Sequence, residues 1–221
     1  MIVFTGFTQA ASEFFWGLAF NNERPWFAAH KEEFECVVNR PLRALAQDTL
    51  ALMERQYPGQ SFLLHVSRIY RDARRLFGRG PYKDHMWFSI KPGSGLLEGP
   101  MFWFELGAAD FSYGMGFYSA TAAQMEAFRR AVDANPARFE RMASAIMDDG
   151  RFRITGENYA RPKGRHEGDI IDEWYNRRRI GLEYSHDFDA ALLNERLPEK
   201  LADAYAVLMP MYEFFLEFYA E

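Results

Sequence analysis

Cysteine is almost absent from this sequence, because Cys36 is the single thiol in 221 residues. One thiol excludes an internal disulfide framework and a structural zinc site made of several cysteines, and it fits a reducing compartment. Cys36 lies within a helical pattern, where we expect it to be buried and inert. The Gly-x-Ser-x-Gly turn of serine hydrolases is also missing, so the sequence carries no signature of nucleophilic catalysis.

Histidine is scarce and scattered. The five histidines are His30, His65, His85, His166 and His186, and no two of them have the spacing of metal ligands on one helix. We therefore predict no metal site and assign no cofactor. A convergence of His85 with His186 and Asp187 in the folded chain stays open, because distance along the sequence does not exclude it.

Long apolar runs and an excess of positive charge are missing too. No stretch of about 18 residues is apolar throughout, and the N-terminus lacks the basic and apolar regions of a signal peptide. We therefore expect a cytoplasmic protein without a membrane partner. The 26 basic side chains are outnumbered by 31 acidic ones, giving a net charge of −5. This balance argues against nucleic-acid binding, which usually relies on a broad positive field.

Aromatic residues, in contrast, make up 17% of the chain, and most of them must fill a core. Apolar residues recur at helical spacing in segments 8–20, 23–57, 121–134, 136–150, 170–175 and from 198 onward. Alternation predicts strands at 62–70, 86–91, 100–106 and 110–119, with shorter runs at 152–156 and 180–184. Turns rather than helices separate the first four strands. We predict a single α+β domain over residues 1–221, with a mostly antiparallel sheet of about four to six strands packed by N-terminal and C-terminal helices.

Local features modify this pattern. Pro41 should break or kink its helix at about Asn39. Gly114 and Gly116 leave room on one face of their strand for a close neighbour or a ligand. Strict alternation places Arg68 at the end of the inward face of its strand. The opposite face, where chemistry would lie, then carries His65, Ser67, Arg71, His85, Ser89, Lys91 and Glu105, unless a bulge changes the register.

Basic side chains are concentrated in residues 68–85. The run Arg68-Ile69-Tyr70-Arg71-Asp72-Ala73-Arg74-Arg75 is followed, after a loop with glycine, by Gly80-Pro81-Tyr82-Lys83-Asp84-His85. Arginine matches the geometry of carboxylate and phosphate, and a lysine and a histidine add a point charge and a titratable donor. We predict a site for a small anionic or phosphorylated ligand. Its binding residues are Arg68, Arg71, Arg74, Arg79, Tyr82 and Lys83.

The same segment offers candidates for acid–base catalysis by an unknown reaction. In this hypothesis His85 carries a proton, and Asp72 orients Arg71 or Arg74. Whether the protein is an enzyme stays open. The competing interpretation is a network that holds the fold, in which the arginines pair with Asp72, Asp84 and Glu105.

Two other classes of function are alternatives. Trp87, Trp103 and Trp174, if they are exposed, would form a surface for a partner protein or a homodimer contact. Basic stretches at 68–83 and 161–179 lie beside tyrosines, as in nucleic-acid interfaces, although the acidic net charge opposes that interpretation.

Several segments resemble the domain of unknown function 2461 family, an uncharacterised bacterial group. The residues that carry the resemblance are Phe4-Thr5-Gly6-Phe7, Asn21-Asn22, Arg24, Trp26-Phe27, His30-Lys31, Tyr70-Arg71-Asp72, Arg74, Pro81-Tyr82-Lys83, His85, Gly114, Gly116, Tyr118, Arg129 and Arg161-Pro162. This chain departs from the family at Leu76, Phe77 and Arg79, where a serine and two lysines are usual. The resemblance covers nearly the whole chain and implies a single α+β domain without an established activity.

Overall fold

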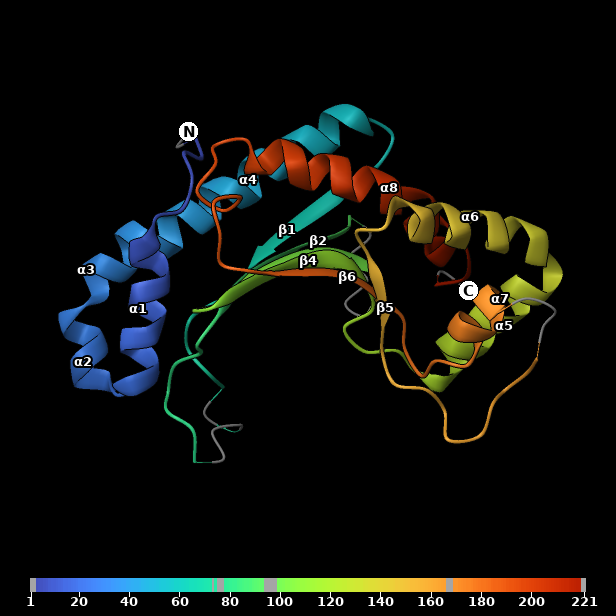
Figure 1. Cartoon of the computed structure of the whole chain (residues 1–221), viewed down its shortest axis with the longest axis horizontal. Helices are drawn as coiled ribbons and strands as arrows, with labels where there is room; N and C mark the ends of the chain where they lie inside the picture. The colour runs from blue at the N-terminus through green and yellow to red at the C-terminus, as the bar shows by residue number, and fades with distance from the viewer. Residues whose placement is uncertain (1–2, 73, 75–77, 94–98, 166–168, 220–221) are drawn as a thin grey trace. The chain divides into compact units, whose positions relative to one another are not determined.

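The computed structural model of the chain describes residues 3–72, 74, 78–93, 99–165 and 169–219 (Figure 1). Arg75, Leu76, Phe77 and His166, which the sequence singles out, lie outside the described residues. The helical elements are α1 (Gln9–Phe20), α2 (Arg24–Ala29), α3 (Lys31–Phe34), the π-helical turn η1 (Glu35–Asn39), α4 (Arg40–Gln56), α5 (Ala122–Ala134), α6 (Pro136–Asp149), α7 (Asp169–Tyr175) and α8 (Leu197–Tyr219). The strands are β1 (Phe62–Val66), β2 (Met86–Pro92), β3 (Met101–Leu106), β4 (Asp110–Gly116), β5 (Arg153–Thr155) and β6 (Gly181–Asp187).

The strands form one six-stranded sheet in the order β1-β2-β3-β4-β6-β5. β5 pairs antiparallel with β6, with Ile154 opposite Leu182. Backbone hydrogen bonds from Phe188 to Ala109 (2.7 Å) and from Phe117 to Ile180 (3.1 Å) extend the antiparallel pairing of β4 with β6 at both ends. The predicted α+β fold with a mostly antiparallel sheet is therefore confirmed.

The chain divides into two compact units. The first unit comprises Met1–Ile90, Trp103–Tyr113 and Ser185–Ala202, and the second comprises Lys91–Phe102, Gly114–Tyr184 and Asp203–Glu221. The single domain and the cytoplasmic location stay predictions. Among the described residues, none of the helices combines the length and the apolar character needed to span a bilayer.

Aromatic side chains fill the core of the first unit. Phe14 on α1 packs against Phe34 on α3, with ring centroids 5.5 Å apart. Phe104 on β3 contacts Phe7 at 6.3 Å and Phe88 at 5.5 Å. Each buried ring of this size stabilises the fold by roughly 1.5–3 kcal/mol relative to an exposed one. The aromatic excess in the sequence is thus largely core.

The second unit has its own aromatic core. Phe139 on α6 contacts Phe128 on α5 and Trp174 on α7, both at 5.5 Å. Phe102 on β3 packs against Tyr212 on α8 at 4.6 Å. Trp174 has no solvent exposure. Its predicted place on an exposed partner surface is therefore wrong, because the apolar face of α7 faces the core of its unit.

Pro41 does not interrupt its helix. The Arg40 N–H group bonds to the carbonyl of Glu35, five residues back, and α4 then continues directly from η1. A wider π turn accommodates the missing proline donor and the bulk of the ring without a break. Val38 takes the inward position of this turn, whereas Cys36 is exposed. The expectation of a buried Cys36 is wrong for this reason.

The glycines of β4 make room for a neighbouring strand. A Cβ atom on Gly114 would lie 1.9 Å from the Leu182 carbonyl oxygen, and one on Gly116 would lie 2.5 Å from that of Ile180. The sequence predicts that a close neighbour or a ligand occupies the space beside these glycines. In the structure a neighbour occupies it, namely the backbone of β6 and of Ile180, the residue before β6. These two glycines allow the close pairing of β4 with β6.

Candidate functional site

A short ladder carries the basic segment of the first unit. Tyr70 pairs antiparallel with Tyr82, the Arg71 N–H group donates to the Pro81 carbonyl (2.8 Å), and the Lys83 N–H group donates to the Ile69 carbonyl (2.7 Å). The two halves of the segment are thus held side by side in the excursion between β1 and β2 (Figure 1). This pairing brings Arg71 and Lys83 together although twelve positions separate them in the sequence.

The side chain of Asn22 fixes this ladder to the junction of α1 and α2. Its Nδ2 donates to the Tyr82 carbonyl (2.9 Å) and its Oδ1 accepts from the Tyr82 N–H group (3.0 Å). Tyr82 is buried and stacks on Phe27 at 4.2 Å. Its role as a ligand-binding residue stays a prediction. From the sequence, Asn22 belongs to the resemblance and to the end of the first helix, but no contact with the basic segment could be predicted for it.

The strand before the ladder changes its inward face once. Phe62 is buried at the start of β1, and strict alternation would bury the even-numbered residues after it. Beyond Val66 the buried residues are instead Ser67 and Ile69, which have odd numbers. Ser67 is fixed there because its Oγ accepts from the Trp87 N–H group (3.0 Å). Arg68 is exposed as a result. Its predicted inward position is wrong, since alternation ends with β1.

Four side chains form a chain of contacts at the start of β2. Arg71 Nε donates to the Tyr82 carbonyl (2.7 Å), and its Nη2 donates to Asp84 Oδ1 (3.2 Å). The same oxygen lies 3.0 Å from His85 Nδ1. On the other side of the imidazole, Nε2 lies 4.0 Å from Glu105 Oε2 on β3. A titratable ring is therefore held between two carboxylates beside a guanidinium group.

Asp72 and Arg74 form a separate pair. Arg74 donates to Asp72 through Nε (3.0 Å), through Nη2 (2.7 Å) and through its backbone N–H group (3.0 Å). The Arg74 side chain is 88% exposed. An exposed pair of this kind contributes little stability, because water and salt screen its charges. Arg79 is also exposed. The catalytic role of Asp72 and the binding roles of Arg74 and Arg79 stay predictions.

Charge is distributed unevenly in this cluster. Burial lowers the pKa of Lys83, and the nearby positive charges of Arg71 and Arg68 lower it further, while Glu105 acts in the opposite direction. Burial raises the pKa of Asp84, but hydrogen bonds from its own backbone and from His85, with the charges of His85 and Arg71, bring it below the ordinary value. The cluster therefore holds Asp84 ionised and places two guanidinium groups, those of Arg71 and Arg68, close to Lys83.

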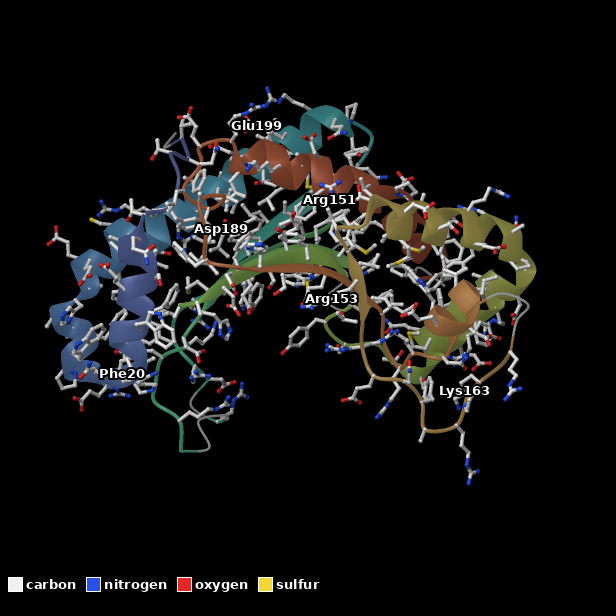
Figure 2. The ribbon with its side chains drawn as sticks, viewed as in Figure 1. Phe20, Arg151, Arg153, Lys163, Asp189 and Glu199 are labelled. Atoms are coloured by element: carbon white, nitrogen blue, oxygen red, sulfur yellow. The ribbon has the colours of Figure 1, made fainter. Side chains whose placement is uncertain are left out.

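An aromatic surface lies beside these charges. Lys83 Nζ stands 5.9 Å from the centre of the Trp87 ring, and His65 contacts the same ring at 5.3 Å. Trp87 and Trp103 are half-buried. Trp16 and Phe20 on α1 are more exposed than either tryptophan, and their rings stack at 6.3 Å. Phe20 is labelled in Figure 2. Sequence reasoning missed this pair because it treated α1 as a core helix.

The second basic stretch, at 161–179, makes local contacts with protein groups. Arg177 donates to the Gly156 carbonyl (2.7 Å) and to Glu173 (3.0 Å), Arg178 pairs with Glu157 (3.4 Å), and Arg179 donates to the Tyr118 carbonyl (3.0 Å). Within the ranges that the structure describes, His, Cys, Asp and Glu side chains nowhere gather in threes as a metal ion would require.

Comparison with known proteins identifies the family of this chain. No curated protein matches it. A family model described as "Conserved hypothetical protein (DUF2461)" matches residues 10–214, which include every residue of the candidate site. Because this match spans most of the chain, the protein belongs to the DUF2461 family, as the resemblance in Tyr70-Arg71-Asp72 and Pro81-Tyr82-Lys83 had indicated.

Proposed function

We propose that the protein binds a small anionic or phosphorylated ligand at the cluster of Arg68, Arg71, Lys83 and His85. The lowered pKa of Lys83 is the observation that supports this proposal. Burial is the largest cause of this shift, and the charges of Arg71 and Arg68 add to it by more than the Glu105 carboxylate opposes it. Such an excess of positive charge is the condition that a bound anion relieves.

The neighbours of Lys83 give each group a role in this proposal. Arg71 is held by the Tyr82 carbonyl and by Asp84, so its guanidinium group is already oriented before a ligand arrives. His85 lies between Asp84 and Glu105 and would carry a proton if the ligand is also a substrate. Arg68 is exposed and extends the positive field outward. The reaction, if there is one, is not assigned by these contacts.

A binding experiment with matched lysine variants tests this function. We expect inorganic phosphate or a sugar phosphate, at a hundred times its dissociation constant, to stabilise the wild type by about 2.7 kcal/mol, which raises Tm by about 5–10 °C. Lys83→Gln should abolish this shift, whereas Lys200→Gln, at an exposed position of the same unit, should retain it. Thermal unfolding in a chloride buffer of constant ionic strength measures both. An equal shift in the wild type and in Lys83→Gln would contradict the proposal.

The stability of the ligand-free protein gives an independent prediction. Because the folded pKa of Lys83 lies below its ordinary value of 10.5, the unfolded chain binds this proton more tightly. The stability contribution of Lys83 is therefore unfavourable at neutral pH and improves as the pH rises through the window below 10.5. We expect Lys83→Met to melt at a higher temperature than the wild type at pH 7, with a smaller difference at pH 10.

Thermal unfolding at both pH values, with Lys200→Met as the control, measures this effect. The result also separates binding from the competing structural interpretation. If Lys83→Met melts below the wild type at pH 7, carboxylates stabilise Lys83, and the basic segment is a network that holds the fold.

A partner surface or homodimer contact has weaker support as a second function. Of the three tryptophans proposed for it, Trp174 is buried, and Trp87 and Trp103 are half-buried. Trp16 and Phe20, which are 47% and 82% exposed, would have to take their place.

A further inference from the structure

Arg129 is a buried cation of the second unit, outside the site proposed above. It lies on α5, which begins with a capping box in which Thr121 and Gln124 bond reciprocally to each other's backbone. The Arg129 side chain is 7% exposed. Its Nη1 atom is buried and has no hydrogen-bond partner among the described residues. Leaving a buried donor of a charged group unpaired is costly, so this atom is a candidate for a ligand contact.

The guanidinium group lies between two tyrosines. Its Cζ atom is 5.5 Å from the centre of the Tyr159 ring and 5.9 Å from that of Tyr175. The Tyr175 hydroxyl donates to Asp133 (2.9 Å), and burial, this hydrogen bond and the charge of Asp133 raise its pKa to about 12. Tyr175 therefore keeps its proton at physiological pH and donates it in the hydrogen bond to Asp133. The rings position Arg129 without neutralising its charge.

A second cation lies on one of these rings. Lys163 Nζ is 4.6 Å from the centre of the Tyr159 ring. Lys163 belongs to the loop between β5 and α7 and is exposed (Figure 2). Asn176 fixes this loop, because its Oδ1 accepts from the Lys163 N–H group (2.7 Å) and its backbone carbonyl accepts from the Tyr159 N–H group (2.9 Å). The Tyr159 ring thus contacts both cations, and Asn176, the residue after α7, fixes the loop that carries Tyr159 and Lys163.

The carboxylate that accompanies Arg129 is poorly placed to satisfy it. Glu126 accepts one hydrogen bond from Arg129 Nη2 at 3.3 Å, and its side chain is 63% exposed. A guanidinium group offers Nη1 and Nη2 along one edge, which matches two oxygen atoms of a single anion. Glu126 accepts from only one of these two nitrogen atoms, Nη2, and the hydrogen bond is long. Its exposure allows it to swing into solvent when a better acceptor arrives.

We propose that Arg129 and Lys163 form a second anion site, which takes a phosphate group in place of the Glu126 carboxylate. Displacing Glu126 removes one negative charge from the surroundings of Arg129 and Lys163, and a phosphate dianion supplies two in its place. One phosphate edge accepts from Nη1 and Nη2 of Arg129, and Lys163 adds its charge from the loop. This site lies in the second unit and does not depend on the function proposed for the first.

The test uses inorganic phosphate and the full chain carrying Lys83→Gln, which removes the first site. Isothermal titration at constant ionic strength compares three further variants on that background, all at exposed positions. Glu126→Gln removes the competing carboxylate and should tighten phosphate binding about two- to fivefold. Lys163→Gln should weaken it by a similar factor. Arg130→Gln, a neighbouring arginine on α5, should leave it unchanged within the error of the titration.

Two results support the site, and their absence overturns it. The supporting results are opposite changes in affinity for Glu126→Gln and Lys163→Gln, and acetate binding that is at least tenfold weaker than phosphate binding. If the two variants bind phosphate like the parent, or if phosphate does not bind, Arg129 is a stacked structural arginine. An Arg129→Gln protein that keeps its circular dichroism spectrum and still binds phosphate would equally refute the proposal.

Discussion

Gly114→Ala is expected to destabilise the protein by about 3 kcal/mol or more, which lowers Tm by roughly 6–12 °C. The added Cβ would lie 1.9 Å from the Leu182 carbonyl oxygen, 2.9 Å from its carbon and 3.2 Å from Glu183 Cα. All three atoms belong to the backbone of β6. They cannot yield as the end of a flexible side chain would, so relief requires β4 and β6 to move apart.

Gly59→Ala provides the control for this effect. A Cβ atom at Gly59 would meet nothing within 4 Å, and the backbone there does not have a positive φ. This substitution should be neutral or stabilise the protein by up to about 1 kcal/mol, because alanine restricts the unfolded chain. Chemical denaturation of both variants measures the difference. A Gly114→Ala protein as stable as Gly59→Ala would show that β4 and β6 do not approach as closely as described.

Trp174→Ala is expected to cost about 3–5 kcal/mol, because it leaves a large cavity beside Phe139. Trp174→Phe should cost clearly less. Phenylalanine refills part of the space, and it also removes the buried Nε1 donor, which has no hydrogen-bond partner among the described residues. Removing an unpaired buried donor recovers part of the packing loss.

Urea unfolding followed by circular dichroism measures both tryptophan variants. Trp16→Ala, at a position that is 47% exposed, is the control and should change the stability by less than about 1 kcal/mol. Equal losses for Trp174→Phe and Trp174→Ala would mean that Nε1 makes a stabilising hydrogen bond after all.

Much of the fold could be predicted from the sequence because the spacing of apolar residues within a single segment indicates whether it forms a helix or a strand. The alternation in 101–106 and the short turns around it define β3 and its antiparallel neighbours without knowledge of the tertiary structure. Threonine favours the N-cap position by residue type, so the start of α5 after Thr121 follows from the sequence, and the structure adds the reciprocal bond to Gln124. The change to helical spacing after residue 121 likewise predicts α5 and α6.

Errors arose where one residue changes the register or where distant segments meet. Strict alternation places Arg68 inward, but β1 ends at Val66, two residues before it, so the alternation does not apply there. The alternative with an exposed Trp174 is wrong, and the sequence could not exclude it because a seven-residue helix is too short to show which face it buries. The position of His85 between Asp84 and Glu105 depends on the pairing of β2 with β3, so the sequence could suggest these partners but not their geometry.

Asn22 couples the ladder formed by residues 69–71 and 81–83 to the first two helices. Its side-chain amide donates to and accepts from the backbone of Tyr82, as a peptide group on a neighbouring strand would. Aspartate lacks the donor, leucine lacks both groups, and glutamine places them one methylene further away. The Asn22 side chain, from the junction of α1 and α2, therefore makes the two hydrogen bonds with Tyr82 that a neighbouring strand would otherwise make. Any separation of Tyr82 from the α1–α2 junction must break both of these hydrogen bonds, so we expect the ladder and the junction to open as one cooperative unit.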